Sequence, residues 1–115
     1  MKITNKSKNV VLAEKASVAR DLFARMKGLL GKNTLPKGEG LAITPCTSIH
    51  TFGMRFPIDA AFYDRGYKVV ALIRGLKPYR ASGWHPTAKG VLELPAGTLT
   101  NESLEVGDEL YFSNP

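Results

Sequence analysis

From Gly40 to the end of the chain, short runs of β-branched, aliphatic and aromatic residues alternate with glycine, proline and other turn residues. Such runs favour strands, because their side chains pack well on a pleated sheet and the turn residues end each run. Together with an apolar run near the start, they predict strands at residues 10–12, 41–44, 48–52, 58–63, 68–74, 90–94 and 109–112. This pattern indicates a mainly β fold, a compact antiparallel sandwich or a partly closed barrel, and not a repeated strand–helix–strand unit.

One N-terminal α-helix is expected ahead of most of these strands, because apolar residues recur there at spacings of four, four and three. Its apolar face would consist of Val18, Leu22, Met26 and Leu29. Ser17 is a residue type that caps helix starts, and a glycine at 28 or 31 can end the helix.

Three further local predictions concern a turn, an irregular segment and a short helix. Asp64-Arg65-Gly66 lies between two predicted strands and is typical of a tight hairpin turn. Residues 75–89 contain two prolines and two glycines and should form the longest irregular segment. Residues 98–105 are expected to form a short helix before the last strand.

Length and composition limit the class of protein. A chain of 115 residues is the size of one domain, so residues 1–115 are expected to form a single domain. Cys46 is the only cysteine, which excludes an intramolecular disulfide and a cysteine-based zinc cluster. No apolar run reaches the roughly 20 residues that span a bilayer. We therefore expect a cytoplasmic protein that does not contact membranes and carries no cofactor or metal ion.

Positive charge is concentrated at the front of the chain. Residues 1–37 contain nine Lys and Arg and two acidic residues, whereas the remainder is close to neutral. A basic N-terminal face could neutralise nucleic-acid phosphates, which makes a nucleic-acid accessory protein one alternative function. The lysines concerned are Lys2, Lys6, Lys8, Lys15, Lys27 and Lys32.

The segment PCTSIHTFGMRFPIDAAF, residues 45–62, gathers several chemically active side chains in an apolar context. If residues 48–52 are extended, His50 shares a face with Ser48 and Phe52, while the residues between them point the other way. A bend is expected at residues 53–57, because glycine marks irregular backbone and proline cannot donate to a β-ladder. The bend would let Arg55 approach Asp59.

Two interpretations of the charged residues remain open. In the first, Arg25, Arg55, Asp59 and Glu93 form ion pairs that hold the fold together. In the second, they belong to a polar pocket rimmed by residues 46–59 and covered by residues 76–88, which binds a small molecule or peptide. The candidate ligand-binding residues are Arg25, Ser48, His50, Arg55, Asp59, Trp84 and Glu93.

Catalysis is a further alternative. A hydrolase or lyase could use His50 with Asp59 or Glu93 as general acid and base, provided that these groups converge on one water-accessible point. Cys46 and His50 are four residues apart, which is not a recognised catalytic spacing.

Pairing of two copies through an exposed strand edge or helix would give a homodimer.

Four sequence motifs, in this order, resemble those of the DUF192 family: GLLGKNTLPKGEGLAI, MRFPIDAAFYD, VLELPAGT and VGDEL. The resemblance extends over nearly the whole chain and implies a compact, mostly β single domain similar to a jelly roll. It implies no activity, because none is assigned to the family. The commoner family form has Trp-Met-Lys-Asn-Thr before Pro-x-Asp; here Arg55 retains the cation, and the Asn-Thr pair is missing.

Overall fold

The computed structural model describes residues 1–20 and 33–113. In these residues the chain forms strands and turns and contains no helix, so no described helix could span a membrane. The mainly β prediction is confirmed. The described strands are β1 (Lys2–Asn5), β2 (Val10–Ala13), β3 (Lys15–Ala19), β4 (Glu39–Ile43), β5 (Ile58–Tyr63), β6 (Val69–Leu76), β7 (Gly90–Pro95) and β8 (Leu110–Ser113).

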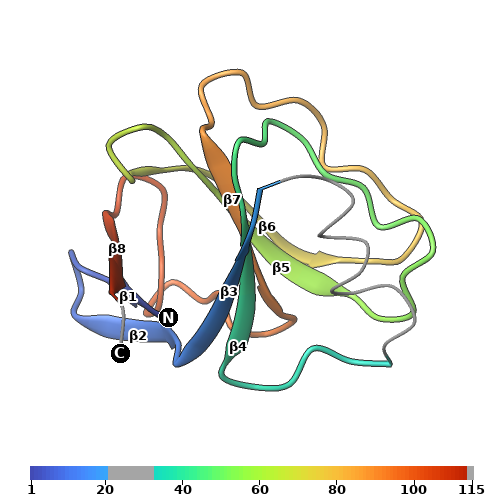
Figure 1. Ribbon diagram of the computed structural model, residues 1–115, viewed down its shortest axis with the longest axis horizontal. Helices are drawn as coiled ribbons and strands as arrows, with labels where there is room; N and C mark the ends of the chain where they lie inside the picture. Colours follow the sequence, from blue (N-terminus) through green and yellow to red (C-terminus); the bar gives the residue numbers. More distant parts are fainter. Residues whose placement is uncertain (21–32, 114–115) are drawn as a thin grey trace.

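The strands form two sheets (Figure 1). A small sheet has the order β2-β1-β8, and a larger sheet has the order β3-β4-β7-β5-β6. Neighbouring strands are antiparallel except β3 and β4, which are parallel. In the part of the chain that the structure describes, the sheets do not join into a closed barrel.

The central strands of the larger sheet are buried on both faces, because every residue of β5 and nearly every residue of β7 is inaccessible to solvent. Alternation along these strands sends successive side chains to opposite faces. One face packs against the small sheet, where Leu92 and Leu94 meet Ile3. The other face, which we call the loop-covered face, carries Phe62 and Val91 beneath apolar side chains from loops. These loop residues include Leu35, Ile49, Met54, Phe56 and Ala88.

Two strands were not predicted from the sequence. Lys2–Asn5 has one large apolar side chain, and Lys15–Ala19 is rich in small residues, so neither run shows a strong β signal. By contrast, β5 has the predicted bounds, and its turn into β6 is confirmed. There Asp64 accepts the backbone N–H groups of Gly66 and Lys68 at 2.9 and 3.0 Å.

The predicted start of the N-terminal helix is wrong. Ser17 and Val18 belong to β3, where they lie opposite Leu41 and Ala42 of β4. The buried residues of β3 are small, and Val18 is 39% exposed instead of lying on a buried helix face. Pairing with β4 therefore makes this segment a strand, although the spacing of its apolar residues predicted a helix. The remaining predicted helix positions, Leu22, Met26 and Leu29, lie outside the described residues.

The predicted short helix at residues 98–105 is also wrong, because this segment is irregular with a turn at residues 101–103. The hydroxyl of Ser103 accepts the N–H of Thr100 at 2.8 Å and can donate to the carbonyl of Thr98 at 2.8 Å. Such side-chain bonds compete with helical backbone bonds and favour a turn.

Candidate functional site

Two loops on one side of the molecule run next to each other, residues 46–51 and residues 79–89 (Figure 1, green and yellow-orange). The N–H of Thr51 donates to the carbonyl of Arg80 at 2.8 Å, and the N–H of His85 donates to that of Thr47 at 2.8 Å. Between these two loops, only His50 and Ala81 form a β-bridge, so the predicted strand at 48–52 is wrong. The loops are joined by irregular backbone bonds and not by a ladder.

The predicted alternation of side chains in this loop is confirmed even though no strand forms. Ile49 and Thr51 are buried, Ser48 and Phe52 are exposed, and His50 is half-buried. The apolar member of the buried pair packs into the core of the loop-covered face. The loop therefore turns Ser48 and Phe52 outward and Ile49 and Thr51 inward.

Thr51 fixes the geometry of the two loops and was not recognised as important from the sequence. Its hydroxyl oxygen accepts the N–H of Arg80 at 2.9 Å and lies 2.6 Å from the carbonyl oxygen of Lys77, to which it can donate. Its backbone carbonyl accepts the N–H groups of Met54 and Tyr79. Because Thr51 is fully buried, these bonds are shielded from water and hold one loop against the other.

A groove of about 540 Å³ lies between the two loops. Its volume is within the range of ligand sites in proteins. Three of the residues proposed from the sequence, Ser48, His50 and Trp84, line it together. The complete lining consists of Ile43, Pro45, Cys46, Thr47, Ser48, Ile49, His50, Ala81, Gly83 and Trp84.

Aromatic side chains on the two loops are unusually exposed. The exposed fractions are 55% for Phe52, 60% for Tyr79 and 72% for Trp84. The rings of His50 and Phe52 have centroids 5.3 Å apart, and those of Phe52 and Tyr79 are 6.2 Å apart. Adjacent exposed aromatic rings next to a groove are typical of a binding surface.

Two polar side chains of the groove are oriented by the local backbone. The thiol of Cys46 can donate to the carbonyl of Ser48 at 3.0 Å. Nδ1 of His50 accepts the N–H of Phe52 at 3.3 Å, which directs the ring along the loop. Both groups therefore have defined positions in the wall of the groove.

Arg55 lies apart from the groove. The predicted bend is present, since Gly53 has φ +85° and β5 begins only at Ile58. The bend does not bring Arg55 to Asp59, because the guanidinium is exposed and donates to Asn33 Oδ1 at 3.3 Å. Within residues 1–20 and 33–113, Arg55 forms no ion pair, so the predicted pairing with Asp59 is wrong. Arg25 lies outside the described residues.

Asp59 is buried and is held by the backbone. Its Oδ1 accepts the N–H of Gly75 at 2.8 Å, and its Oδ2 accepts those of Gly97 and Leu99 at 3.0 and 2.8 Å. With 1% of its surface exposed, Asp59 joins the end of β6 and the loop after β7 to β5. It has the position of a structural carboxylate.

Glu93 is also completely buried, but on the other face of the larger sheet. It lies opposite Ala60, whereas Asp59 lies opposite Leu94. Alternation then places Glu93 on the loop-covered face and Asp59 on the face toward the small sheet. The two carboxylates therefore do not meet at one water-accessible point with His50, as acid–base catalysis would require.

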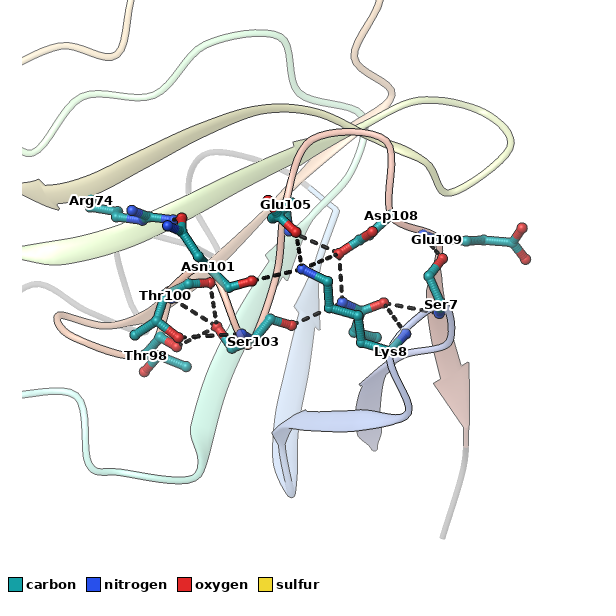
Figure 2. A network of polar contacts seen from close by, with 11 residues as sticks. Ser7, Lys8, Arg74, Thr98, Thr100, Asn101, Ser103, Glu105, Asp108 and Glu109 are labelled. Carbon is teal, nitrogen blue, oxygen red and sulfur yellow. Dashed lines mark hydrogen bonds and ion pairs between the residues drawn. The ribbon is translucent and has the colours of Figure 1, made fainter.

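Part of the predicted basic face is neutralised by acidic residues near the end of the chain (Figure 2). Lys8 forms ion pairs with Glu105 and Asp108, and Lys6 pairs with Glu109 at 3.3 Å. The hydrogen bond from Lys8 to Glu105 raises the pKa of the Lys8 ammonium above its ordinary value. These lysines are thus less available to phosphates than their number suggests.

The histidines do not form a metal site together. The ring of His85 packs 4.3 Å from that of Phe62, and its Nε2 lies 3.3 Å from the Ser82 carbonyl oxygen. In the described part of the chain, no cluster of three His, Cys, Asp or Glu side chains is arranged to hold a metal ion.

The fold and the groove define a mainly β domain with two sheets and a loop-bordered cleft beside the larger sheet. The chain belongs to the DUF192 family, described as "Uncharacterized ACR, COG1430", whose model matches residues 2–112. The resemblance seen in the sequence motifs is therefore confirmed. The chain is also 30% identical over 112 residues to a UPF0127 protein of Thermococcus sibiricus. This match covers 94% of this chain and 72% of the relative.

Two solved structures share the fold. A protein of unknown function from Novosphingobium aromaticivorans has a TM-score of 0.80 at 20% identity, covering 96% of this chain and 82% of its own. A "putative transcription regulator" from Sinorhizobium meliloti has a TM-score of 0.75 at 19% identity, covering 96% and 89%. At these identities the similarity establishes the fold alone.

Proposed function

We propose that this chain is a binding domain that holds a small molecule or peptide in the groove between residues 45–50 and 81–84. The observation that carries the proposal is Trp84, which is 72% exposed where it lines a groove of about 540 Å³. An indole buries roughly 150–250 Å² when it is covered, and apolar burial is worth roughly 25 cal/mol per Å². A ligand that covered the exposed 72% of Trp84 would thus contribute roughly 3–4.5 kcal/mol.

The lining favours a ligand that combines a ring or aliphatic group with hydrogen-bonding groups. Trp84, Ile43 and Pro45 offer apolar surface, while Ser48 and His50 offer polar atoms. Sites for small ligands commonly combine a mainly apolar lining with a few placed polar groups. An aromatic amide or a peptide side chain with its flanking amides has this chemistry.

Neither alternative function is supported as well. A hydrolase or lyase would need Asp59 or Glu93 near His50 and water, yet both carboxylates are buried on opposite faces of the sheet. A nucleic-acid protein would rely on the whole set of N-terminal lysines, of which Lys6 and Lys8 are paired with acidic side chains.

Trp84 is the only tryptophan, so its fluorescence reports directly on the groove. A set of aromatic amides and capped dipeptides is titrated into the protein, and each hit is quantified by NMR in the wild type and in Trp84→Ala. Tyr111→Ala is the matched control, because Tyr111 is a 56% exposed aromatic residue on β8, away from the groove lining.

The expected result is an affinity at least about tenfold lower in Trp84→Ala and unchanged in Tyr111→Ala, since the ligand-covered indole contributes more than 1.4 kcal/mol. Ser48→Ala should weaken only those ligands that carry a hydrogen-bonding group. Equal affinity in the wild type and Trp84→Ala for every ligand found would refute the proposed function.

A further inference from the structure

A second cavity, of about 350 Å³, lies elsewhere in the molecule and shares no lining residue with the groove. It is formed where the ends of β3 and β4 approach the β5–β6 turn and β8. Two cations, Arg20 and Lys89, and three aromatic residues, Tyr63, Tyr67 and Phe112, belong to its lining.

The charge of this cavity is entirely positive among the described residues that line it. No Asp or Glu is among them, and the other lining residues are uncharged side chains. Within residues 1–20 and 33–113, neither Arg20 nor Lys89 forms an ion pair, in contrast to Lys6 and Lys8. Two cations at one concave site attract an anion more strongly than either does alone.

Lys89 is held in place by its backbone and by an aromatic ring. Its N–H donates to the Tyr63 carbonyl at 2.8 Å, and its carbonyl accepts the Cys46 N–H at 2.9 Å. Its Nζ lies 5.8 Å from the centroid of the Tyr67 ring, a cation–π distance. The backbone of Lys89 is therefore fixed at the cavity, and the Tyr67 ring favours a position of the exposed ammonium beside it, which reduces the entropy cost of binding.

The aromatic residues give the cavity an apolar wall. The ring centroids of Tyr63 and Tyr67 are 5.7 Å apart, and each lies 5.4 Å from that of Phe112. Such a wall limits the access of water from one side of the site, whereas the side chains of Arg20 and Lys89 are exposed to solvent. Burial, aided by the nearby Tyr67 and Cys46, raises the pKa of Tyr63 to about 12. The phenol thus remains neutral at physiological pH and adds no negative charge.

We infer that this cavity binds a small oxyanion, a phosphate or a carboxylate group, between the guanidinium of Arg20 and the ammonium of Lys89. Arg20 can donate two parallel hydrogen bonds to such a group, and Lys89 supplies a point charge. The site is separate from the groove at Trp84, so it can bind an oxyanion whether or not the groove has a ligand.

The test uses inorganic phosphate and acetate as probes, each titrated into isotope-labelled protein at neutral pH. Potassium chloride at matched ionic strength is the reference, because it screens charge without offering oxyanion geometry. Arg20→Gln and Lys89→Gln remove the cations singly. Lys77→Gln is the control, since Lys77 is an exposed cation outside the cavity lining. Thermal unfolding of each variant checks that it is folded.

Saturable amide shifts at Lys89 and the β5–β6 turn are expected in phosphate or acetate and not in chloride. Affinity should fall about tenfold or more in Arg20→Gln and in Lys89→Gln, and should not change in Lys77→Gln. Tighter binding of phosphate than acetate, or the reverse, identifies which oxyanion the site prefers. No saturable shift beyond chloride, or equal affinity in all variants, overturns the inference.

Discussion

Replacement of Asp59 by asparagine tests whether this buried carboxylate holds the fold together or serves a ligand. Its two oxygens accept three backbone N–H groups, from Gly75, Gly97 and Leu99, at 2.8–3.0 Å. An asparagine has almost the same size but only one oxygen. If that oxygen keeps Gly97 and Leu99, the amide N–H₂ must face the N–H of Gly75, which then loses its acceptor.

The cost follows from these three bonds. A hydrogen bond to a charged group contributes about 1.5–3 kcal/mol, and a neutral one about 0.5–1.5 kcal/mol. The variant loses one hydrogen bond to a charged group and weakens two others, but it no longer carries the cost of burying a charge. The net loss in the free energy of unfolding is about 2–4 kcal/mol. Since small domains have about 5–15 kcal/mol of stability, the variant should fold but unfold in less urea.

Urea unfolding followed by far-UV circular dichroism measures this change as a lower midpoint at unchanged slope. Asp64→Asn is the matched control, because Asp64 also accepts two backbone N–H groups, but in a solvent-accessible turn. We expect it to cost less than about 1 kcal/mol. A destabilisation by Asp59→Asn as small as that of the control, combined with weaker binding in the groove, would refute the structural role.

Three further changes test the packing. Thr51→Val keeps the shape of the side chain but removes the hydroxyl that joins the two loops. It should lower the free energy of unfolding in urea by about 1–3 kcal/mol and weaken ligand binding in the groove. Unchanged stability would contradict this role of Thr51. Gly90→Ala places a Cβ against Tyr63 Oη, too close for both atoms to stay in place, and should destabilise the fold by about 1–3 kcal/mol or more. Gly66→Ala, whose Cβ would lie 3.5 Å from its nearest neighbour, should not destabilise the fold to that extent. The pKa of Tyr63 is about 12 in the folded protein and about 10 in the unfolded chain. The stability that neutral Tyr63 contributes is therefore fully present below pH about 10 and should be lost as the pH rises from about 10 through about 12. Tyr63→Phe should remove that alkaline loss, and an unchanged pH profile in the variant would argue against it.

The central strands could be predicted because local and tertiary preferences agree there. Residues 58–63 combine apolar side chains with an Asp-Arg-Gly turn, and the structure buries this strand on both faces. At residues 15–19 the preferences disagree, because the helical spacing that starts at Val18 competes with parallel pairing to β4. That pairing joins segments more than 20 residues apart, and no local pattern reveals it.

The charged residues show a similar limit. The sequence pointed to Arg55, Asp59 and Glu93 because buried charges need partners. For Asp59 the partners are three backbone N–H groups and not a cation. Backbone donors cannot be predicted from residue types, because nearly every residue carries one. Glu93 is separated from Asp59 by the thickness of the sheet, although one strand register brings their backbones close.

Three of the groove residues, Ser48, His50 and Trp84, were predicted from the chemistry of their side chains, and the prolines and glycines near them explain why their loops are irregular. Pro45, Gly53 and Gly83 prevent regular strands, and the loop backbones satisfy their N–H and C=O groups by bonding across to each other. Without a ladder, the two loops need not pack flat against a neighbouring sheet, and Phe52, Tyr79 and Trp84 can project beside a cleft. A ligand that covers these rings would supply apolar contacts like those that the covering loops make to Phe62 and Val91, which supports the proposal of a binding function.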